Sequence, residues 1–444
     1  MTIAATVTEN PFDLPFDLPA GLAGFDADFM TDLLRHRGLI AATNRVVRMQ
    51  EAGVGMTAGY FSALKKVTCS YLEPTPAPSR FVIKTWPELE IMPREAIRGY
   101  FRKDVRGYAA FAPEEFYPRP HALLAAYDEA GNRWALVMED AETFATHKVH
   151  EAELTLDETR SLIPRLVDIA VRWEGCDEGD AAARLVALDI PLWASPGHLG
   201  VYQAVMPGGA PLLDKLVSIG SWISPTWDDY LGKNVAVEFT RRLRSFFERA
   251  DPARGATCTL THGDLRGDNL FLAPPSPRCP DGWVVIDFQH LCRGPIPSDL
   301  AYLMNSGSVL PEVYTGEGLR RILRDFYDAF IERTRRYPAY TYAQFEQEYA
   351  TMSTVLYVYF IGMGAAIWQA GAFRNELAAR VELGNGVATE MSLTPEERRQ
   401  RMWWRKTSAN FRETFKTFGL YDYILSLPLD DPPPIFIDLP AHLR

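Results

Sequence analysis

Two short segments of the sequence bring carboxylates and an amide together at spacings that suit the transfer of a phosphoryl group. They are THGDLRGDNLFL at residues 261–272 and WVVIDFQ at residues 283–289. Each contains a short apolar run typical of a strand, and the ten residues between them include four prolines, so we predict a β-hairpin with a long tip. Asn269 opens the first strand and Asp287 closes the second. Antiparallel pairing then places both side chains at the same end of the hairpin, away from its tip.

The side chains at that end have the chemistry of a magnesium site. An amide oxygen and a carboxylate side by side are ligands that Mg²⁺ prefers when the phosphates of a nucleotide supply the rest of its shell. Asp264 lies five residues before Asn269, on the loop that enters the hairpin. A carboxylate at that place can orient a substrate hydroxyl and accept its proton without binding the metal.

These residues resemble the kinase-like superfamily of aminoglycoside phosphotransferases, choline kinases and ecdysteroid-kinase-like enzymes. His262, Asp264 and Asn269 match its HxDxxxxN catalytic loop, and DFQ, which starts at Asp287, stands where it has a DFG-like metal motif. Eukaryotic protein kinases share this logic, but HGD and DFQ are more similar to the small-molecule branch. The resemblance implies that Asp264 is the base, that Asn269 and Asp287 hold magnesium, and that His262 braces the loop. Asp299 resembles an aspartate that braces the same loop from a helix start, although a helix cap has the same position.

A kinase of this type also needs a cation for the α- and β-phosphates of the nucleotide, and Lys84 is the candidate. It ends the apolar run of RFVIKTW, although a lysine on an edge strand gives the same pattern. For its acidic partner the resemblance points to Asp104 in FRKDVRGY, where the family usually has glutamate. Aspartate is shorter, so we expect the helix to lie closer or a water to bridge. Glu95 is the rival partner, and both acids could instead lie on a solvated helix face.

Two further segments resemble parts of the family that contact the nucleotide. The first, GVGMTAGYF, is similar to a phosphate-covering loop in which glycine lets backbone N–H groups approach oxygens, but glycines also mark ordinary turns. The second, LVMED, is similar to the segment whose backbone pairs with adenine, or it simply ends a strand. The residues concerned are Gly53, Gly55 and Gly59 in the first and Met138, Glu139 and Asp140 in the second.

Specificity for the acceptor should come from aromatic and acidic side chains in the second half of the chain. Such side chains could enclose a quaternary amine or lie against a flat hydrophobic scaffold. More often, residues of these types form the core. The candidates are Trp222, Trp227, Asp228 and Asp229 in one cluster and Tyr357, Tyr359 and Trp368 in an uncharged segment.

The elements that must position these residues change in character along the chain. A short helix is predicted at residues 28–37. Runs of β-branched and aromatic residues bounded by turn residues predict strands at 61–72, 80–86 and 133–140. One main helix is predicted at 91–111, and after residue 150 helices dominate. This order predicts an α+β fold with an antiparallel sheet in the first half.

We predict four parts in the chain. Residues 1–40 form an N-terminal arm, which contains a tandem PFDL repeat, and the short helix. Residues 41–140 form a small lobe with the sheet, and residues 141–430 form a larger, mostly helical lobe with the catalytic loop, the metal motif and the acceptor site. Residues 431–444 are a Pro-rich tail. The resemblance implies a bilobal, protein-kinase-like fold, with the boundary near residues 139–141.

Composition excludes several function classes. With a formal net charge of -11 over 444 residues, no nucleic-acid partner is expected, because a phosphate backbone needs a basic face. The five cysteines are scattered and never form CxxC, which favours a reducing cytoplasm over a disulfide framework or a zinc site. The N-terminus lacks the pattern of a signal peptide. Residues 351–373 carry no formal charge and could cross a bilayer, but no Lys/Arg cluster flanks them, so we predict a buried helix and no membrane insertion.

We therefore expect a phosphotransferase that uses ATP and Mg²⁺ and moves the γ-phosphoryl group to a hydroxyl of a small molecule. A hydrophobic, ecdysteroid-like alcohol is the first expectation for the acceptor, a choline-like amine the second and an aminoglycoside the third. The alternative is a catalytically weak, nucleotide-binding pseudokinase or scaffold. This alternative is suggested by aspartate in place of glutamate at residue 104.

Overall fold

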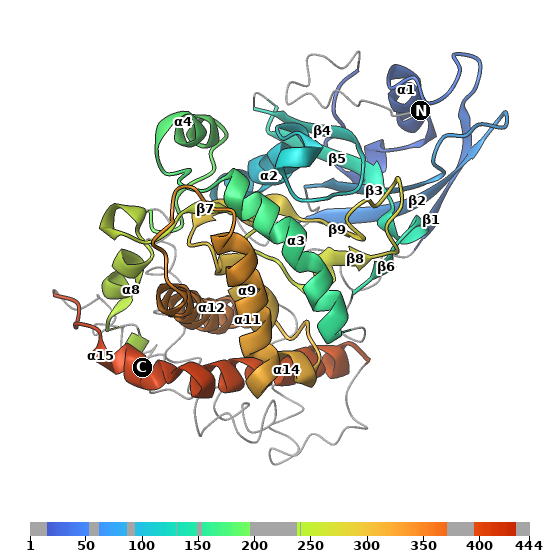
Figure 1. Cartoon of the computed structure of the whole chain (residues 1–444). Coiled ribbons are helices and arrows are strands. Elements are labelled where there is room, and N and C mark those ends of the chain that lie inside the picture. Colours follow the sequence, from blue (N-terminus) through green and yellow to red (C-terminus); the bar gives the residue numbers. More distant parts are fainter. Residues whose placement is uncertain are drawn as a thin grey trace. The chain divides into compact units, whose positions relative to one another are not determined.

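The computed structural model describes residues 16–52, 62–86, 94–129, 131–148, 153–195, 238–239, 241–370 and 395–431, and their side chains except those of 95–96, 358–370, 395–401 and 404 (Figure 1). The chain divides into two compact units. Unit 1 comprises Met1–His147, Arg184–Ile190 and Asn269–Leu291, and unit 2 comprises Lys148–Ala183, Pro191–Asp268 and Cys292–Arg444.

Unit 1 is built around a five-stranded antiparallel sheet with the strand order β1-β2-β3-β5-β4. Its strands are β1 (Val46–Ala52), β2 (Ala63–Tyr71), β3 (Arg80–Thr85), β4 (Ala122–Asp128) and β5 (Arg133–Glu139). β3 lies at the centre, because Lys84 pairs with Leu64 of β2 on one side and with Leu136 of β5 on the other. Lys84 is therefore not an edge-strand lysine, an alternative that its sequence context had left open.

The helices of unit 1 lie near the ranges predicted for them. Its helical elements are α1 (Ala27–His36), α2 (Arg94–Ala109) and the short 3-10 turns η2 (Leu22–Gly24), η3 (Pro113–Glu115), η4 (Ala141–Thr143) and η7 (Phe288–His290). The helix predicted at residues 28–37 is confirmed as α1, which starts after Asp26 because that side chain accepts hydrogen bonds from the N–H groups of Asp28 and Phe29. The helix predicted at 91–111 corresponds to α2.

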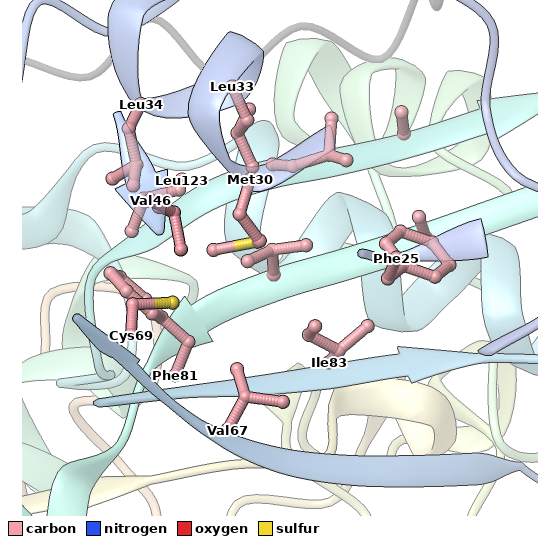
Figure 2. Packing of buried hydrophobic residues seen from close by; sticks show 14 of the residues in the cluster. Phe25, Met30, Leu33, Leu34, Val46, Val67, Cys69, Phe81, Ile83 and Leu123 are labelled. Carbon is pink, nitrogen blue, oxygen red and sulfur yellow. The ribbon is translucent and has the colours of Figure 1, made fainter. Parts of the chain in front are cut away.

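The alternation of side chains along β3 separates the two faces of the sheet. Phe81 and Ile83 are fully buried in a hydrophobic cluster to which α1 contributes Met30 and Leu33 (Figure 2). Lys84 points to the opposite face, where it meets α2. The sheet thus packs an apolar core on one face and presents a charged side chain on the other.

The hairpin predicted from the two motif segments is confirmed, with shorter strands. β8 (Leu270–Leu272) pairs antiparallel with β9 (Trp283–Val285), and β6 (Thr146–His147) pairs with the other edge of β8. The Ile286 N–H donates to the Asn269 carbonyl at 3.0 Å. Asn269 and Asp287 therefore flank the two strands at the end away from the tip, instead of lying within them.

Unit 2 is mainly helical in the part of the chain that the structure describes. Its helices are α3 (Leu156–Arg172), α4 (Gly179–Ala187), α8 (Leu243–Arg249), α9 (Ser298–Asn305), α10 (Pro311–Tyr314), α11 (Gly316–Ile331), α12 (Tyr342–Ala370), α14 (Pro395–Phe418) and α15 (Leu420–Ser426), with η5 (Pro252–Arg254) and η6 (Gly267–Asn269) as short 3-10 turns. β7 (Thr259–Thr261) pairs antiparallel with β10 (Cys292–Gly294). The last residues of α4, from Arg184 onward, group with unit 1, as does Asn269 of η6.

Helix α12 contains most of the uncharged segment at residues 351–373. Residues 351–357 are all buried, and Asn305 of α9 donates a hydrogen bond from Nδ2 to Ser353 Oγ at 3.1 Å. The predicted buried helix is confirmed for these residues. In the ranges that the structure describes, no helix has the length and apolar character needed to span a membrane.

The division into units differs in detail from the boundary placed near residues 139–141. The first stretch of unit 1 runs to His147, because β6 pairs with β8. Residues 269–291, which the sequence had assigned to the larger lobe, group with the sheet of unit 1 for the same reason. Residues 1–15 of the predicted arm and 432–444 of the predicted tail lie outside the described residues.

Candidate active site

Three charged side chains from distant parts of the sequence meet in unit 1. The Lys84 ammonium lies 2.6 Å from Asp104 Oδ2 and 2.8 Å from Asp287 Oδ1. The Asp104 side chain is fully buried, and 6% of the Lys84 side chain and 16% of the Asp287 side chain are exposed. The predicted pairing of Lys84 with Asp104 is confirmed as a direct contact, so no bridging water is needed. The side chain of the rival partner, Glu95, lies outside those described.

Charge and burial act in opposite directions on this cluster. Burial alone lowers the pKa of Lys84, but the carboxylates of Asp104 and Asp287 outweigh it, and the net effect raises the pKa of the lysine. Burial raises the pKa of Asp104, with the nearby Lys84 charge acting to lower it. Lys84 therefore stays protonated and serves both carboxylates.

Asp104 also holds the metal motif through its second oxygen. Its Oδ1 accepts a hydrogen bond from the Phe288 N–H at 2.9 Å. The Phe288 ring is fully buried and packs edge-on against Tyr108 of α2. Gly107 permits this packing, because a Cβ at that position would lie 2.4 Å from Phe288 Cβ. The close approach of α2 to η7 lets the shorter aspartate reach both Lys84 and Phe288.

Gly107 was not among the predicted site residues. The sequence did contain a signal, since a glycine inside a predicted helix lowers helix propensity and usually has a packing reason. That reason is the contact with Phe288, which lies far away in the sequence. The pattern of α2 by itself could not identify it.

Asp287 has a backbone conformation that is uncommon for residues other than glycine. Its φ of 71° lies in the left-handed region, at the point where the chain passes from β9 to η7. Residues in such conformations concentrate at ligand-binding sites. One carboxylate oxygen of Asp287 contacts Lys84, and the other accepts a hydrogen bond from Gln289 Nε2 at 3.0 Å. The carboxylate is thus held in one orientation by partners on both sides.

The residues at this end of the hairpin fit a magnesium ion by their chemistry. Asp287 supplies a carboxylate, and Asn269, which is 4% exposed, supplies an amide oxygen. The backbone bond between Ile286 and Asn269 fixes the spacing of the two residues. Hard oxygen donors of this kind suit Mg²⁺ together with phosphate oxygens. The assignment of Asn269 and Asp287 as metal ligands stays a prediction.

Asp299 braces the catalytic loop of unit 2 through two backbone groups. Its Oδ2 accepts from the His262 N–H at 3.0 Å, and its Oδ1 accepts from the Gly263 N–H at 3.1 Å. Gly263 has a φ of 77°, which a glycine adopts without strain. Asp299 lies in the first turn of α9, whose N-cap is Pro297. The bracing contact implied by the resemblance is confirmed, in preference to a simple helix cap.

His262 and Asp264 form the turn that Asp299 holds. His262 is fully buried, and its Nδ1 accepts a hydrogen bond from the Asp264 N–H at 3.2 Å. Its side chain thus fixes the loop backbone, as expected of a brace. Asp264 is 4% exposed, and Arg266 Nε lies 3.4 Å from its Oδ1. Arg266 was not predicted as a site residue, and only its place on the catalytic loop could have indicated it.

The far end of this loop is also held by its backbone. The Gly267 N–H donates to Ser308 Oγ at 2.7 Å. A Cβ at residue 267 would lie 2.4 Å from the Lys148 carbonyl oxygen, so glycine is required there by space. Ser306 Oγ lies 2.7 Å from Ser308 Oγ and extends the contact. Both ends of the loop are therefore anchored within unit 2.

The residues predicted on the adenine side lie at and just after the end of β5. Met138 is buried, and Glu139 Oε2 lies 2.7 Å from Arg278 Nη2. Asp140 is buried, and its carboxylate contacts Arg80. The N–H groups of Glu139 and Asp140 also donate to carbonyls within unit 1. A contact of this segment with adenine would use its other backbone groups, and it stays a prediction.

Part of the predicted site lies outside the described residues. This holds for Gly53, Gly55, Gly59, Trp222, Trp227, Asp228 and Asp229, and for the side chains of Tyr359 and Trp368. Tyr357 is described: it is 1% exposed, and its ring packs edge-on against Phe411 and Phe415 of α14. This position is typical of the core residue that the sequence had offered as the alternative. Its packing gives no support to a role in acceptor binding.

Comparison with known proteins identifies a family. Residues 105–340, more than half of the chain, match the model of the APH phosphotransferase enzyme family. The matched range contains Asp264, Asn269, Asp287 and Asp299, and it begins one residue after Asp104. The search of curated protein sequences gave no match.

Among solved structures, three matches have low sequence identity. The GDP complex of a mutant aminoglycoside 2'-phosphotransferase-IIIa is 12% identical, with 81% of this chain and 97% of that chain covered and a TM-score of 0.43. An ethanolamine kinase of Plasmodium vivax is 12% identical, with 90% and 93% covered and a TM-score of 0.43. A choline/ethanolamine kinase family protein from Mesorhizobium loti is 10% identical, with 85% and 98% covered and a TM-score of 0.38.

The family match rests on the same segments that carry the catalytic loop and the metal motif. It agrees with the α+β, protein-kinase-like fold class that these motifs predicted, with its antiparallel sheet in unit 1 and its helices in unit 2. The chain belongs to the APH phosphotransferase enzyme family.

Proposed function

We propose that this protein transfers the γ-phosphoryl group of Mg·ATP to a hydroxyl of a small molecule. The observation that carries the proposal is the buried cluster of Lys84, Asp104 and Asp287, with Asp104 also bonded to the Phe288 backbone. A lysine oriented by an acidic residue on a helix, next to a metal-motif carboxylate, is the arrangement that the phosphates of a nucleotide require.

Each residue has one role in the proposed reaction. Asp264 orients the substrate hydroxyl and accepts its proton, while the hydroxyl oxygen forms the new bond to the γ-phosphorus and the bond to the β,γ-bridging oxygen breaks. Lys84 donates to oxygens of the α- and β-phosphates. Asn269 and Asp287 hold magnesium, which supplies positive charge to the phosphates when it is bound. No covalent intermediate with the enzyme is needed.

The alternative of a catalytically weak scaffold has lost its motivating observation. It rested on aspartate at residue 104 in place of glutamate. Asp104 reaches Lys84 directly at 2.6 Å, so the shorter side chain gives no reason to expect a broken nucleotide site.

For the acceptor, we propose a hydrophobic alcohol of the ecdysteroid type first, a choline-like amine second and an aminoglycoside third. We also propose the cytoplasm as the location. The five cysteines are free and buried, which is the usual state in a reducing compartment.

The proposal is tested by measuring ADP release from Mg·ATP, and in parallel from Mg·GTP, across a library of alcohols from the three acceptor classes. We expect release that depends on the acceptor. Asp264→Asn should lower kcat by about 10²- to 10⁴-fold, because the proton acceptor is lost, and leave the Kd for Mg·ATP within about twofold. Magnesium-dependent binding of ATP without acceptor-dependent ADP from any class would favour the scaffold.

A further inference from the structure

A short segment of the chain packs against α2 from outside the sheet. Residues Arg184–Ile190, which we name the strap, group with unit 1 although their neighbours in sequence belong to unit 2. Leu185 and Ile190 are fully buried, and the Ile190 N–H donates to the Leu185 carbonyl at 2.9 Å. The strap is therefore a closed, packed turn.

The tip of the strap grips the middle of α2. Arg106 Nη1 donates to the Leu188 carbonyl at 2.7 Å and to Asp189 Oδ2 at 2.6 Å. Arg102 Nη1 lies 3.7 Å from the same Asp189 oxygen. Asp189 thus contacts two arginines that are one helical turn apart.

The start of the strap holds the C-terminal end of α2. Arg184 Nη2 donates to the Ala110 carbonyl at 2.9 Å, just beyond the last residue of the helix. The same guanidinium makes two contacts with Glu115, of 2.6 Å and 3.2 Å. A cation at this place complements the partial negative charge of a helix C-terminus.

The strap and the lysine cluster hold opposite sides of the same helix. Arg102 and Arg106 each lie two residues from Asp104, and at 3.6 residues per turn this places them nearly opposite to it. Asp104 binds Lys84 and the Phe288 N–H on the inner side. Rotation of α2 about its axis would therefore break contacts on both sides.

We propose that Asp189 is a positioning residue, which through Arg102 and Arg106 sets the rotation of α2 and so the reach of Asp104 toward Lys84. This inference rests on the proposed function. Aspartate is shorter than glutamate, so Asp104 tolerates less displacement of its helix than a glutamate would. The strap supplies the second point of attachment that this shorter side chain requires.

The expected size of the effect follows from exposure. The Asp189 side chain is 54% exposed, and exposed ion pairs are weak. Arg106 is only 16% exposed and also bonds a backbone carbonyl, which strengthens the contact. We expect a measurable change in nucleotide binding and no loss of the fold.

The test uses Asp189→Asn in the full-length protein, with Mg·ATP as the probe. Asp189 has a φ of 52°, and asparagine adopts this left-handed conformation more readily than most residues, so the variant removes the charge and keeps the turn. The Kd for Mg·ATP, measured by calorimetry, should rise about two- to fivefold. Hydrogen exchange of the α2 amides should become faster, with little change in Tm.

Two further variants separate positioning from a general loss of stability. In an Asp104→Asn background, Asp189→Asn should leave the Kd unchanged, because the strap acts through Asp104. Glu178→Gln breaks the exposed Glu178–Arg336 pair, which spans 2.6 Å and is remote from α2 in sequence, and it should alter neither Kd nor α2 exchange.

The inference is overturned if Asp189→Asn leaves the Kd of the wild-type background unchanged, or if it raises the Kd equally in both backgrounds. A wild-type chain that binds no Mg·ATP would overturn the proposed function instead. The exchange of the α2 amides then decides whether the strap restrains the helix.

Discussion

The two sets of predicted site residues are held in different ways. In unit 1, the side chains of Lys84, Asp104 and Asp287 hold one another by charge. In unit 2, the carboxylate of Asp299 holds the backbone of the catalytic loop by accepting two N–H groups. The first arrangement depends on a balance of charges in a buried place, and the second depends on hydrogen bonds to a turn. Substitutions should therefore damage the two sets differently.

The largest effect is expected from removing the cation of the charged cluster. Lys84→Met leaves Asp104 buried beside Asp287 without its ammonium partner, and the free energy of unfolding should fall by roughly 3–5 kcal/mol. Chemical denaturation measures the change. As a control, Lys84→Met combined with Asp104→Asn should recover part of that stability, because the amide still accepts from Phe288, but it should not recover binding of Mg·ATP. A loss below about 1 kcal/mol for Lys84→Met would show that the cluster is not held by charge.

The brace of the catalytic loop should come next. Asp299→Ala removes the acceptor of two backbone N–H groups, and we expect a loss of roughly 2–3 kcal/mol in unfolding free energy. Because Asp299 holds the loop that carries Asp264, kcat should fall far more than the affinity for Mg·ATP. Steady-state kinetics and calorimetry on the same preparation check this split. Equal losses in kcat and affinity would contradict a brace that acts on the loop alone.

The close approach of α2 to η7 predicts a smaller effect. Gly107→Ala places a methyl group 2.4 Å from Phe288 Cβ, so overpacking should cost about 1–3 kcal/mol and weaken binding of Mg·ATP. Gly99→Ala on the same helix is the matched control, because nothing lies within 4 Å of its Cβ. It should stabilise the protein by about 0.5–1 kcal/mol through helix propensity. If both variants behave alike, the contact with Phe288 has no energetic weight.

The smallest effect concerns a buried carboxylate of unit 2 that is bonded by neutral donors. Glu348 accepts from the Thr257 N–H at 2.7 Å and from the Tyr340 hydroxyl at 2.6 Å. Burial raises the pKa of Glu348, with the hydrogen bonds from Thr257 and Tyr340 acting to lower it. A raised pKa in the folded state means that the contribution to stability is complete below the usual pKa of glutamate and is lost as the pH rises through the folded value.

Glu348→Gln should therefore flatten the decline of unfolding free energy above about pH 4.5. Denaturation curves of both proteins across this range measure the difference. An unchanged pH profile would mean that the three hydrogen bonds fully offset burial and that Glu348 is an ordinary carboxylate.

Much of the candidate site could be predicted from contiguous stretches of sequence. The hairpin follows from two apolar runs and a proline-rich tip, and antiparallel pairing then requires Asn269 and Asp287 to lie at one end. Lys84 could be predicted because it ends a strand pattern. The catalytic loop could be predicted because its residues are close together in the chain. Each of these predictions depends on local patterns that secondary structure converts directly into position.

The tertiary structure alone decided the contacts between distant segments. Lys84 and Asp287 are 203 residues apart, and Arg106 and Asp189 are 83 apart. The sequence left Asp104 and Glu95 as alternative partners of Lys84, because the choice depends on how near α2 lies to β3 and η7. That distance is set by packing, and above all by the missing side chain of Gly107 against Phe288. Local patterns determined which residues carry the chemistry, and long-range packing determined which of them meet.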